Sequence, residues 1–144
     1  MDKKAATDLL AILTSQNEML DSMIELQKLV RQAVTEKNWV DLDTTLFKLN
    51  ELTENFTQLE AKREALCCRI CSVSGSQPVP SMHQVSTMLP EDVRPLVKDV
   101  LHQVRRKLSI SKVENDALND YIGITKEFLQ DSVKLANEYE SAFA

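Results

Sequence analysis

The chain has 144 residues, enough for about one domain, and 43% of them are hydrophobic, so the chain can bury a core. Only 5% are aromatic, and there are only two glycines and four prolines, which is typical of an all-α protein with one structured break. The net charge of −5 argues against a general nucleic-acid-binding protein, which normally carries a basic face.

The first helical pattern runs from about residue 5 to residue 36. Its apolar positions follow a three–four spacing with one polar layer at Gln16: Leu9, Ile12, Met19, Met23, Leu26, Val30 and Ala33. A second apolar seam lies beside the first and consists of Leu10, Leu13, Leu20 and Ile24. Two adjoining seams make a stripe that is too wide for a two-stranded coiled coil. We therefore expect this helix to contact two partners.

A second helical pattern begins after Asn38, whose side chain is suited to cap the free amides of the next turn. The pattern starts at Trp39 and is interrupted by one exposed arginine, Arg63. Its apolar positions are Leu42, Leu46, Leu49, Leu52, Phe56, Leu59, Leu66, Ile70 and Val73. Because the link between the two helices is only a few residues long, we expect an antiparallel hairpin over residues 5–73.

Residues 74–90 interrupt the helical pattern with Gly75 and with three of the four prolines, Pro78, Pro80 and Pro90. Within this break, Ser81 followed by Gln84 predicts a capping box. The capping box would start one short helical turn that ends near Met88.

A third long helix is expected over residues 91–140, with Pro95 in its first turn, where amides lack intrahelical acceptors. Its first half carries a clear apolar stripe of Val93, Val97, Val100, Val104 and Leu108. In the second half the stripe thins to Ser111, Asn115, Leu118, Ile122, Thr125, Leu129 and Val133. This half also contains Gly123, and an interior helix glycine costs about 1 kcal/mol relative to alanine. This half is therefore expected to be less well anchored than the first half, a weakness that a bound partner could repair.

The charge also changes within this third helix. Residues 91–112 carry six basic and three acidic side chains, whereas residues 113–144 carry two basic and seven acidic ones. Solvated helix faces are the favoured interpretation of such runs. For Arg105, Arg106 and Lys107, pairing with an acidic surface of a partner is the second interpretation.

No apolar stretch has the length of a targeting or membrane-spanning segment. The longest run near the N-terminus, residues 9–13, is bracketed by Asp8 and Thr14. A signal peptide needs a longer apolar core, and a spanning helix needs about 20 apolar residues. We therefore expect a cytoplasmic protein without membrane insertion.

Three cysteines, Cys67, Cys68 and Cys71, lie within the second helical pattern. A structural zinc site needs four ligands, and His83 and His102 do not have the paired spacing that would complete one. A redox CxxC pair normally lies where a strand meets a helix, and no strand pattern is present. Cys67 flanks the apolar stripe, and Cys68 and Cys71 are expected to turn outward. Helix packing is therefore favoured over adventitious oxidation, metal pickup or a functional role.

Other catalytic patterns are absent from the sequence. The two glycines, Gly75 and Gly123, cannot form a phosphate-binding loop. The two histidines are nineteen residues apart and form neither an HExxH motif nor a nucleophile–base pair. We expect no enzymatic activity, no cofactor and no metal.

Most of the chain resembles the FlgN family of flagellar export chaperones. The similarity starts in the run "LLAILTSQNEMLDSMIELQKLVRQAVTEKNWVDLDTTLFKLNELTENFTQLEAKREAL". The matching residues there are Leu9, Leu10, Leu13, Gln16, Ala33, Asn38, Leu42, Leu59, Glu60, Arg63 and Leu66. The run "VENDALNDYIGITKEFLQDSVKLANEY" matches the last helix of the family more loosely, at Asn115, Leu118, Asn119, Leu129 and Leu135.

This resemblance implies a single all-α domain over residues 1–144, in which the hairpin and the third long helix form a three-helix, coiled-coil-like bundle. It implies a cytoplasmic chaperone that binds the C-terminal helices of the hook-filament junction proteins, FlgK and FlgL. The chaperone would prevent their early assembly and deliver them to the flagellar type III export gate. The candidate client-binding part is residues 113–140. Its client-binding candidates are Leu118, Ile122, Leu129 and Val133, and core packing is the alternative role for them. Tyr121 is the candidate contact for the export gate.

A second interpretation of the chain is a structural helical adaptor that has no secretion client. Such an adaptor would self-associate through the same surfaces, and a homodimer would form if one copy occupied the groove of the other.

Overall fold

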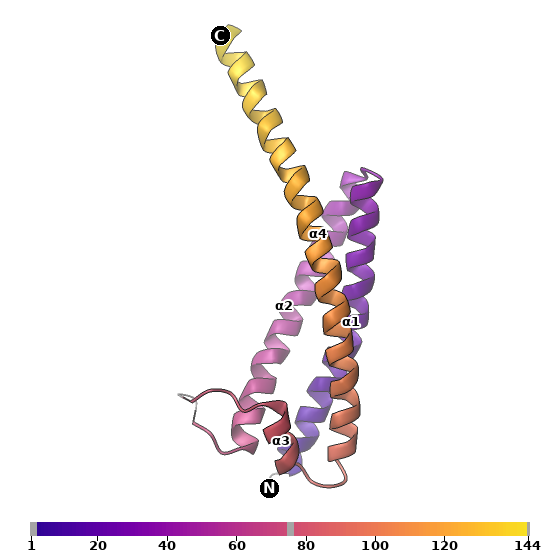
Figure 1. Ribbon diagram of the computed structural model, residues 1–144, viewed down its shortest axis with the longest axis vertical. Helices are drawn as coiled ribbons and strands as arrows, with labels where there is room; N and C mark the ends of the chain where they lie inside the picture. The colour runs from indigo at the N-terminus through magenta and orange to yellow at the C-terminus, as the bar shows by residue number, and fades with distance from the viewer. Residues whose placement is uncertain (1–2, 75–76, 144) are drawn as a thin grey trace.

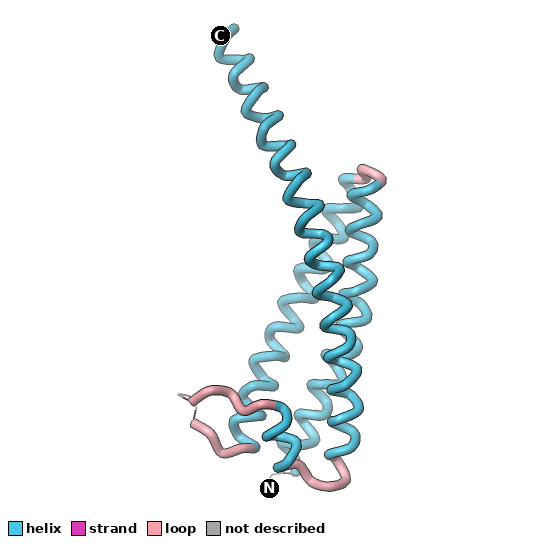
Figure 2. The backbone as a smooth tube through the Cα atoms, viewed as in Figure 1, coloured by secondary structure: helices cyan, strands magenta, loops and turns pink. Residues whose placement is uncertain are grey.

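The computed structural model describes residues 3–74 and 77–143, and it describes side chains only as far as Leu118. The described residues form helices and loops without a strand (Figures 1 and 2). The helices are α1 (Lys3–Thr35), α2 (Trp39–Ile70), α3 (Met82–Met88) and α4 (Arg94–Phe143). The predicted all-α class is confirmed.

Helices α1 and α2 form the predicted antiparallel hairpin. Lys37 adopts a positive φ of 56°, and the Asn38 amide donates to the Ala33 carbonyl at 2.9 Å, which closes the end of α1. The Asn38 side chain then accepts from the Asp41 amide at 3.2 Å, as a helix N-cap does. The link between the helices is therefore short because one residue in the left-handed region ends α1 and the next residue caps α2.

Helix α3 begins with the predicted capping box. The Gln84 amide donates to Ser81 Oγ at 3.2 Å, and the Ser81 amide donates to Gln84 Oε1 at 3.0 Å. All four helices contribute to a core at this end of the molecule, which is formed by Ala5, Ala6, Leu9, Leu13, Cys67, Ile70, Val85, Leu89, Val93 and Val97. The short helix therefore covers the open end of the hairpin.

Helix α4 starts three residues later than expected. The Pro90 carbonyl accepts from the Val93 and Arg94 amides, so residues 91–93 form a turn before the helix begins at Arg94. Pro95 is the second helical residue, where its missing amide leaves no acceptor unsatisfied.

Helices α1 and α4 run parallel to each other. Asn17 Nδ2 donates to Gln103 Oε1, and Lys107 Nζ donates to Asp21 Oδ2, each at 2.9 Å and each over 86 residues of sequence. Further along, Gln27 bonds to Ser111 over 84 residues. The sequence separation changes little along the interface, as expected for two helices that run side by side in the same direction.

The buried residues of the α1–α4 interface repeat every seven positions. On α4 they are Val97, Val104, Ser111 and Leu118, and on α1 the corresponding residues are Leu13, Leu20, Gln27 and Val34. This repeat is that of a two-stranded coiled coil, in which one narrow seam faces one partner. The predicted contact of α1 with two partners is confirmed, because α1 packs against both α2 and α4.

Helices α2 and α4 do not approach each other closely among the described residues. The seam of α4 that is buried among the described side chains faces α1 and not α2. The apolar stripe of α2 is consequently only half-buried over most of its length, and Cys67 and Ile70 are its only buried residues.

Candidate functional site

Leu118 is the last residue of the α1–α4 seam whose side chain the structure describes, and it packs in a small cluster with Val30 and Val34. Because α1 ends at Thr35, the parallel arrangement leaves the rest of α4 without a neighbouring segment of α1. Figure 1 shows α4 continuing well beyond the link between α1 and α2. Residues 119–143 correspond to about 38 Å of helix at the usual rise of 1.5 Å per residue.

Of the predicted client-binding residues, Leu118 lies in the core of the chain itself. It is 4% exposed, which agrees with the core-packing alternative for this position. Ile122, Leu129 and Val133 lie outside the residues whose side chains the structure describes, as does Tyr121.

The half-buried stripe of α2 faces the same region. Leu42, Leu46 and Leu49 are partly buried against the cluster of Val30, Val34 and Leu118. Further along α2, the stripe continues with the partly buried residues Leu52, Phe56 and Leu59. Near the hairpin link, Val40 and Phe47 are 76% and 70% exposed. This end of the molecule therefore presents more apolar surface than its own helices cover.

Arg63, predicted to be exposed, is instead partly buried, with 17% of its side chain accessible. It pairs with Glu60, which also accepts a 2.9 Å hydrogen bond from Gln16 Nε2 of α1. On its other side, Arg63 Nη1 lies 3.3 Å from the Met82 sulfur of α3. The prediction failed because the apolar stripe of α2 meets a polar layer of α1 at this position, and the sequence of α2 does not show that layer.

The electrostatics of this cluster follow from its pairing. The hydrogen bond from Arg63 is the main cause that holds the pKa of Glu60 below its ordinary value, and the hydrogen bond from Gln16 adds to it. The hydrogen bond to Glu60 raises the pKa of Arg63 in turn. Both side chains therefore stay charged, and the cluster holds α1, α2 and α3 together rather than exchanging protons.

Burial raises the pKa of the Cys67 thiol, which is fully buried and lies 3.7 Å from the Met82 sulfur. The expectation that Cys71 turns outward was wrong, because Cys71 is partly buried and packs against the same core. Its pKa is also raised, chiefly by burial. A nucleophilic cysteine needs a lowered pKa, so these two thiols have the character of packing residues.

Metal binding has no support among the residues whose side chains are described. No three histidine, cysteine, aspartate or glutamate side chains in that part of the chain are arranged to hold a metal ion. The free thiol of Cys68, which is partly exposed, remains accessible to solvent.

The three basic residues at positions 105–107 of α4 have different surroundings. Lys107 is 13% exposed and forms an ion pair with Asp21 at 2.9 Å, so it belongs to the α1–α4 interface. Arg106 is exposed, and Arg105 lines a pocket between α3 and α4. The interpretation as a solvated helix face is therefore correct for Arg106 but not for Lys107.

Comparison of the chain with models of known families, with curated proteins and with solved structures gave no match. Within the described part of the chain, no helix combines the length and apolar character needed to span a bilayer. A proposal of function therefore rests on the resemblance of the sequence together with the geometry of the molecule.

Proposed function

We propose that this protein is a flagellar export chaperone that binds the C-terminal helices of the hook-filament junction proteins, FlgK and FlgL. The observation that carries the proposal is the extension of α4 beyond the end of the hairpin (Figure 1). A helix that extends past the end of its neighbour can offer an apolar stripe to a helix of another protein.

The client helix would bind along the face of α4 that follows Leu118. By helical spacing, Ile122, Leu129 and Val133 share this face with Leu118. Leu118 itself anchors α4 to α1, so the client would start where the intramolecular seam stops. Tyr121 lies next to this face in sequence and is the proposed contact for the export gate.

The half-buried stripe of α2 gives the client a second surface. A helix placed between α2 and α4 would cover Leu42, Leu46 and Leu49, which α1 covers only in part. The client would then be a fourth helix beside α1, α2 and α4, and it would cover the side of α2 that α4 does not reach. Burial of apolar surface contributes about 25 cal/mol per Å², so a few turns of helix give useful affinity after ordering costs.

A second candidate is a self-associating helical adaptor without a secretion client. The exposed apolar side chains Val40 and Phe47 favour this alternative, because a second copy of the chain would also bury them. In either case the function is binding, and we propose neither catalysis nor a cofactor.

The test is a calorimetric titration of the full chain with the C-terminal helical segments of the hook-filament junction proteins. One-to-one binding at a Kd of about 1 μM or tighter is expected, corresponding to about 8 kcal/mol. Leu129→Asp and Val133→Asp should abolish binding, because each places a charge in the apolar contact. Gln130→Asp introduces the same charge on a neighbouring face of α4 and should bind as the original chain does.

Circular dichroism of each variant must show unchanged helix content, so that loss of binding is not loss of folding. Absence of heat with soluble segments, together with a mass in solution that rises with concentration, would favour the adaptor instead. Equal weakening by Gln130→Asp and Leu129→Asp would contradict the assigned face while leaving binding itself established.

A further inference from the structure

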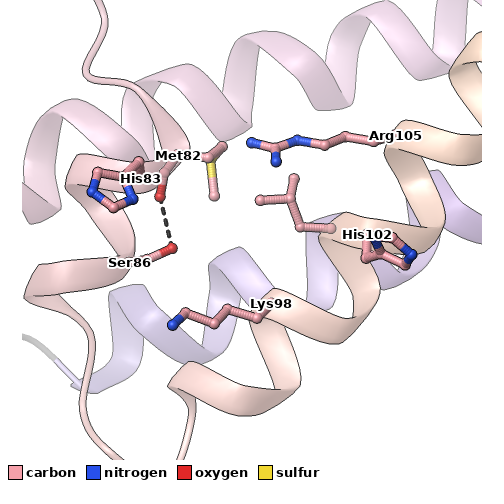
Figure 3. A pocket seen from close by; sticks show the side chains of 7 residues that line it. Met82, His83, Ser86, Lys98, His102 and Arg105 are labelled. Atoms are coloured by element: carbon pink, nitrogen blue, oxygen red, sulfur yellow. Dashed lines mark hydrogen bonds between the residues drawn. The ribbon is translucent and has the colours of Figure 1, made fainter.

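A pocket of about 280 Å³ lies between α3 and α4, away from the proposed client surface. Its lining consists of Met82, His83, Ser86, Lys98, Leu101, His102 and Arg105. Figure 3 shows Lys98 and Arg105 extending from α4 toward α3 on opposite sides of this space. The lining contains two cationic side chains and two imidazoles but no acidic side chain.

The helical spacing of α4 explains how these residues come together. Lys98, Leu101, His102 and Arg105 stand at positions i, i+3, i+4 and i+7, so they share one face of the helix. The capping box at Ser81 fixes the start of α3 and thereby places Met82, His83 and Ser86 opposite that face. The cationic groups are therefore held on regular helices rather than on loops.

The two cations lack partners within the described part of the chain. Neither Lys98 nor Arg105 forms an ion pair there, whereas Lys107 on the same helix pairs with Asp21 and Arg94 donates to the Leu89 carbonyl. Two like charges beside one cavity repel each other, and an anion placed between them would relieve that repulsion. The positive charge of Lys98 and Arg105 thus favours an anionic ligand.

We propose that this pocket binds the carboxylate of an acidic peptide side chain, with glutamate as the preferred residue. The planar guanidinium of Arg105 is suited to bind both oxygens of a carboxylate, and the Lys98 ammonium supplies a second charge. Met82 and Leu101 provide an apolar wall for the methylene groups of glutamate. The volume is at the lower limit for small-molecule sites, so it fits one side chain rather than a nucleotide.

The hydroxyl of Ser86 does not contribute a donor to this site. Its Oγ donates to the Met82 carbonyl at 2.7 Å, which leaves Lys98 and Arg105 as the donors that extend into the space (Figure 3). The α4 residues that line the pocket lie in the helix interior, where their amides are already bonded, so α4 contributes only side chains to the site. Phosphate, whose sites commonly add backbone amides, is therefore compared with the carboxylate in the test.

The test is a ¹H–¹⁵N NMR titration of the full chain with three probes: a blocked tri-glutamate peptide, the matched tri-glutamine peptide, and inorganic phosphate. Saturable shifts are expected with tri-glutamate only, and they should centre on the amides of residues 82–86 and 98–105. Raising the ionic strength from about 0.05 M to about 0.3 M should weaken the binding, because the groups are exposed and screened by salt.

The Lys98→Gln/Arg105→Gln double variant should weaken tri-glutamate binding about five- to tenfold, as expected for two exposed ion pairs. The matched control is Arg106→Gln/Lys112→Gln, which removes the same charge from exposed positions of α4 that do not line the pocket. Equal weakening in both double variants would overturn the site, since it would indicate general charge attraction. Binding of tri-glutamine as tight as that of tri-glutamate, or binding of phosphate without the peptide, would also overturn the proposal.

Discussion

Gln27 and Ser111 exchange two hydrogen bonds across the buried interface between α1 and α4. Gln27 Nε2 donates to the Ser111 carbonyl at 3.3 Å, and Ser111 Oγ donates to Gln27 Oε1 at 3.1 Å. The two residues are 3% and 8% exposed and form a polar layer within an otherwise apolar seam. A polar layer of this kind sets the register of a coiled coil at some cost in stability.

Replacement of Ser111 by alanine is expected to lower the free energy of unfolding by about 1 to 2 kcal/mol. The substitution leaves the buried Gln27 Oε1 without a donor, and an unsatisfied buried acceptor is costly. Denaturant unfolding followed by circular dichroism measures the change. The matched control is Ser109→Ala, since Ser109 is exposed on the same helix and bonds only to the Arg105 carbonyl.

Combining Ser111→Ala with Gln27→Leu removes both partners, so the double variant should be more stable than the sum of the single losses indicates. Strict additivity of the two substitutions would contradict a direct interaction between the side chains. Ser109→Ala should change the free energy of unfolding by less than about 0.5 kcal/mol.

Glu60 makes the stability of the three-helix junction depend on pH. Its pKa is lowered in the folded chain from the ordinary value of 4.5, mainly by the hydrogen bond from Arg63. A lowered pKa means that the carboxylate contributes stability above the unfolded value and that this contribution is lost as the pH falls through the folded value. Glu60→Gln is therefore expected to destabilise the protein at pH 7 by about 1 kcal/mol.

The difference between Glu60→Gln and the original chain should start to shrink as the pH falls below the ordinary value of 4.5, and it should be lost as the pH falls through the lower pKa of the folded chain. Thermal unfolding at a series of pH values measures both curves. Glu54→Gln is a suitable control, because Glu54 is exposed on the same helix. A difference that stays constant from neutral to acidic pH would show that the charge of Glu60 is not what stabilises the junction.

The three cysteines are expected to react with iodoacetamide at very different rates. Cys67 should be protected in the folded protein, because it is fully buried and its pKa is raised by burial. Cys68 is partly exposed and should be alkylated first. Mass spectrometry of the digested protein at successive times locates each modification, and unfolding in denaturant should make the rates similar. Early modification of Cys67 under native conditions would contradict its place in the core.

The helical elements could be predicted well from the sequence because their signals are local. The N-cap at Asn38 and the capping box of Ser81 and Gln84 depend only on residues within one turn, and both are present as predicted. The position of Gln16 as a polar layer was likewise visible from the apolar spacing. The surroundings of Arg63 could not be predicted in this way, because Glu60, α1 and α3 determine them together.

The packing of α4 against α1 but not against α2 was also missed, although the sequence contains a signal for it. Val97, Val104, Ser111 and Leu118 recur strictly every seven residues, and Leu13, Leu20, Gln27 and Val34 do the same on α1. Aligning the two repeats would have predicted that α1 and α4 pack side by side, with a constant difference in residue number between paired residues. The broader apolar stripes obscured this seam, since they include residues that α4 leaves exposed, such as Leu108.

Leu118 distinguishes the intramolecular core from the proposed client surface. Because Leu118 is buried against Val30 and Val34, Leu118→Ala is expected to lower the free energy of unfolding by about 2 kcal/mol, the lower end for a core leucine in a small cluster. Val113→Ala is the matched control, since Val113 is 70% exposed on the same helix and should change stability very little. Denaturant unfolding without any client measures both effects. If Leu118→Ala leaves the unfolding curve unchanged but weakens client binding, Leu118 belongs to the client surface and the seam between α1 and α4 ends earlier.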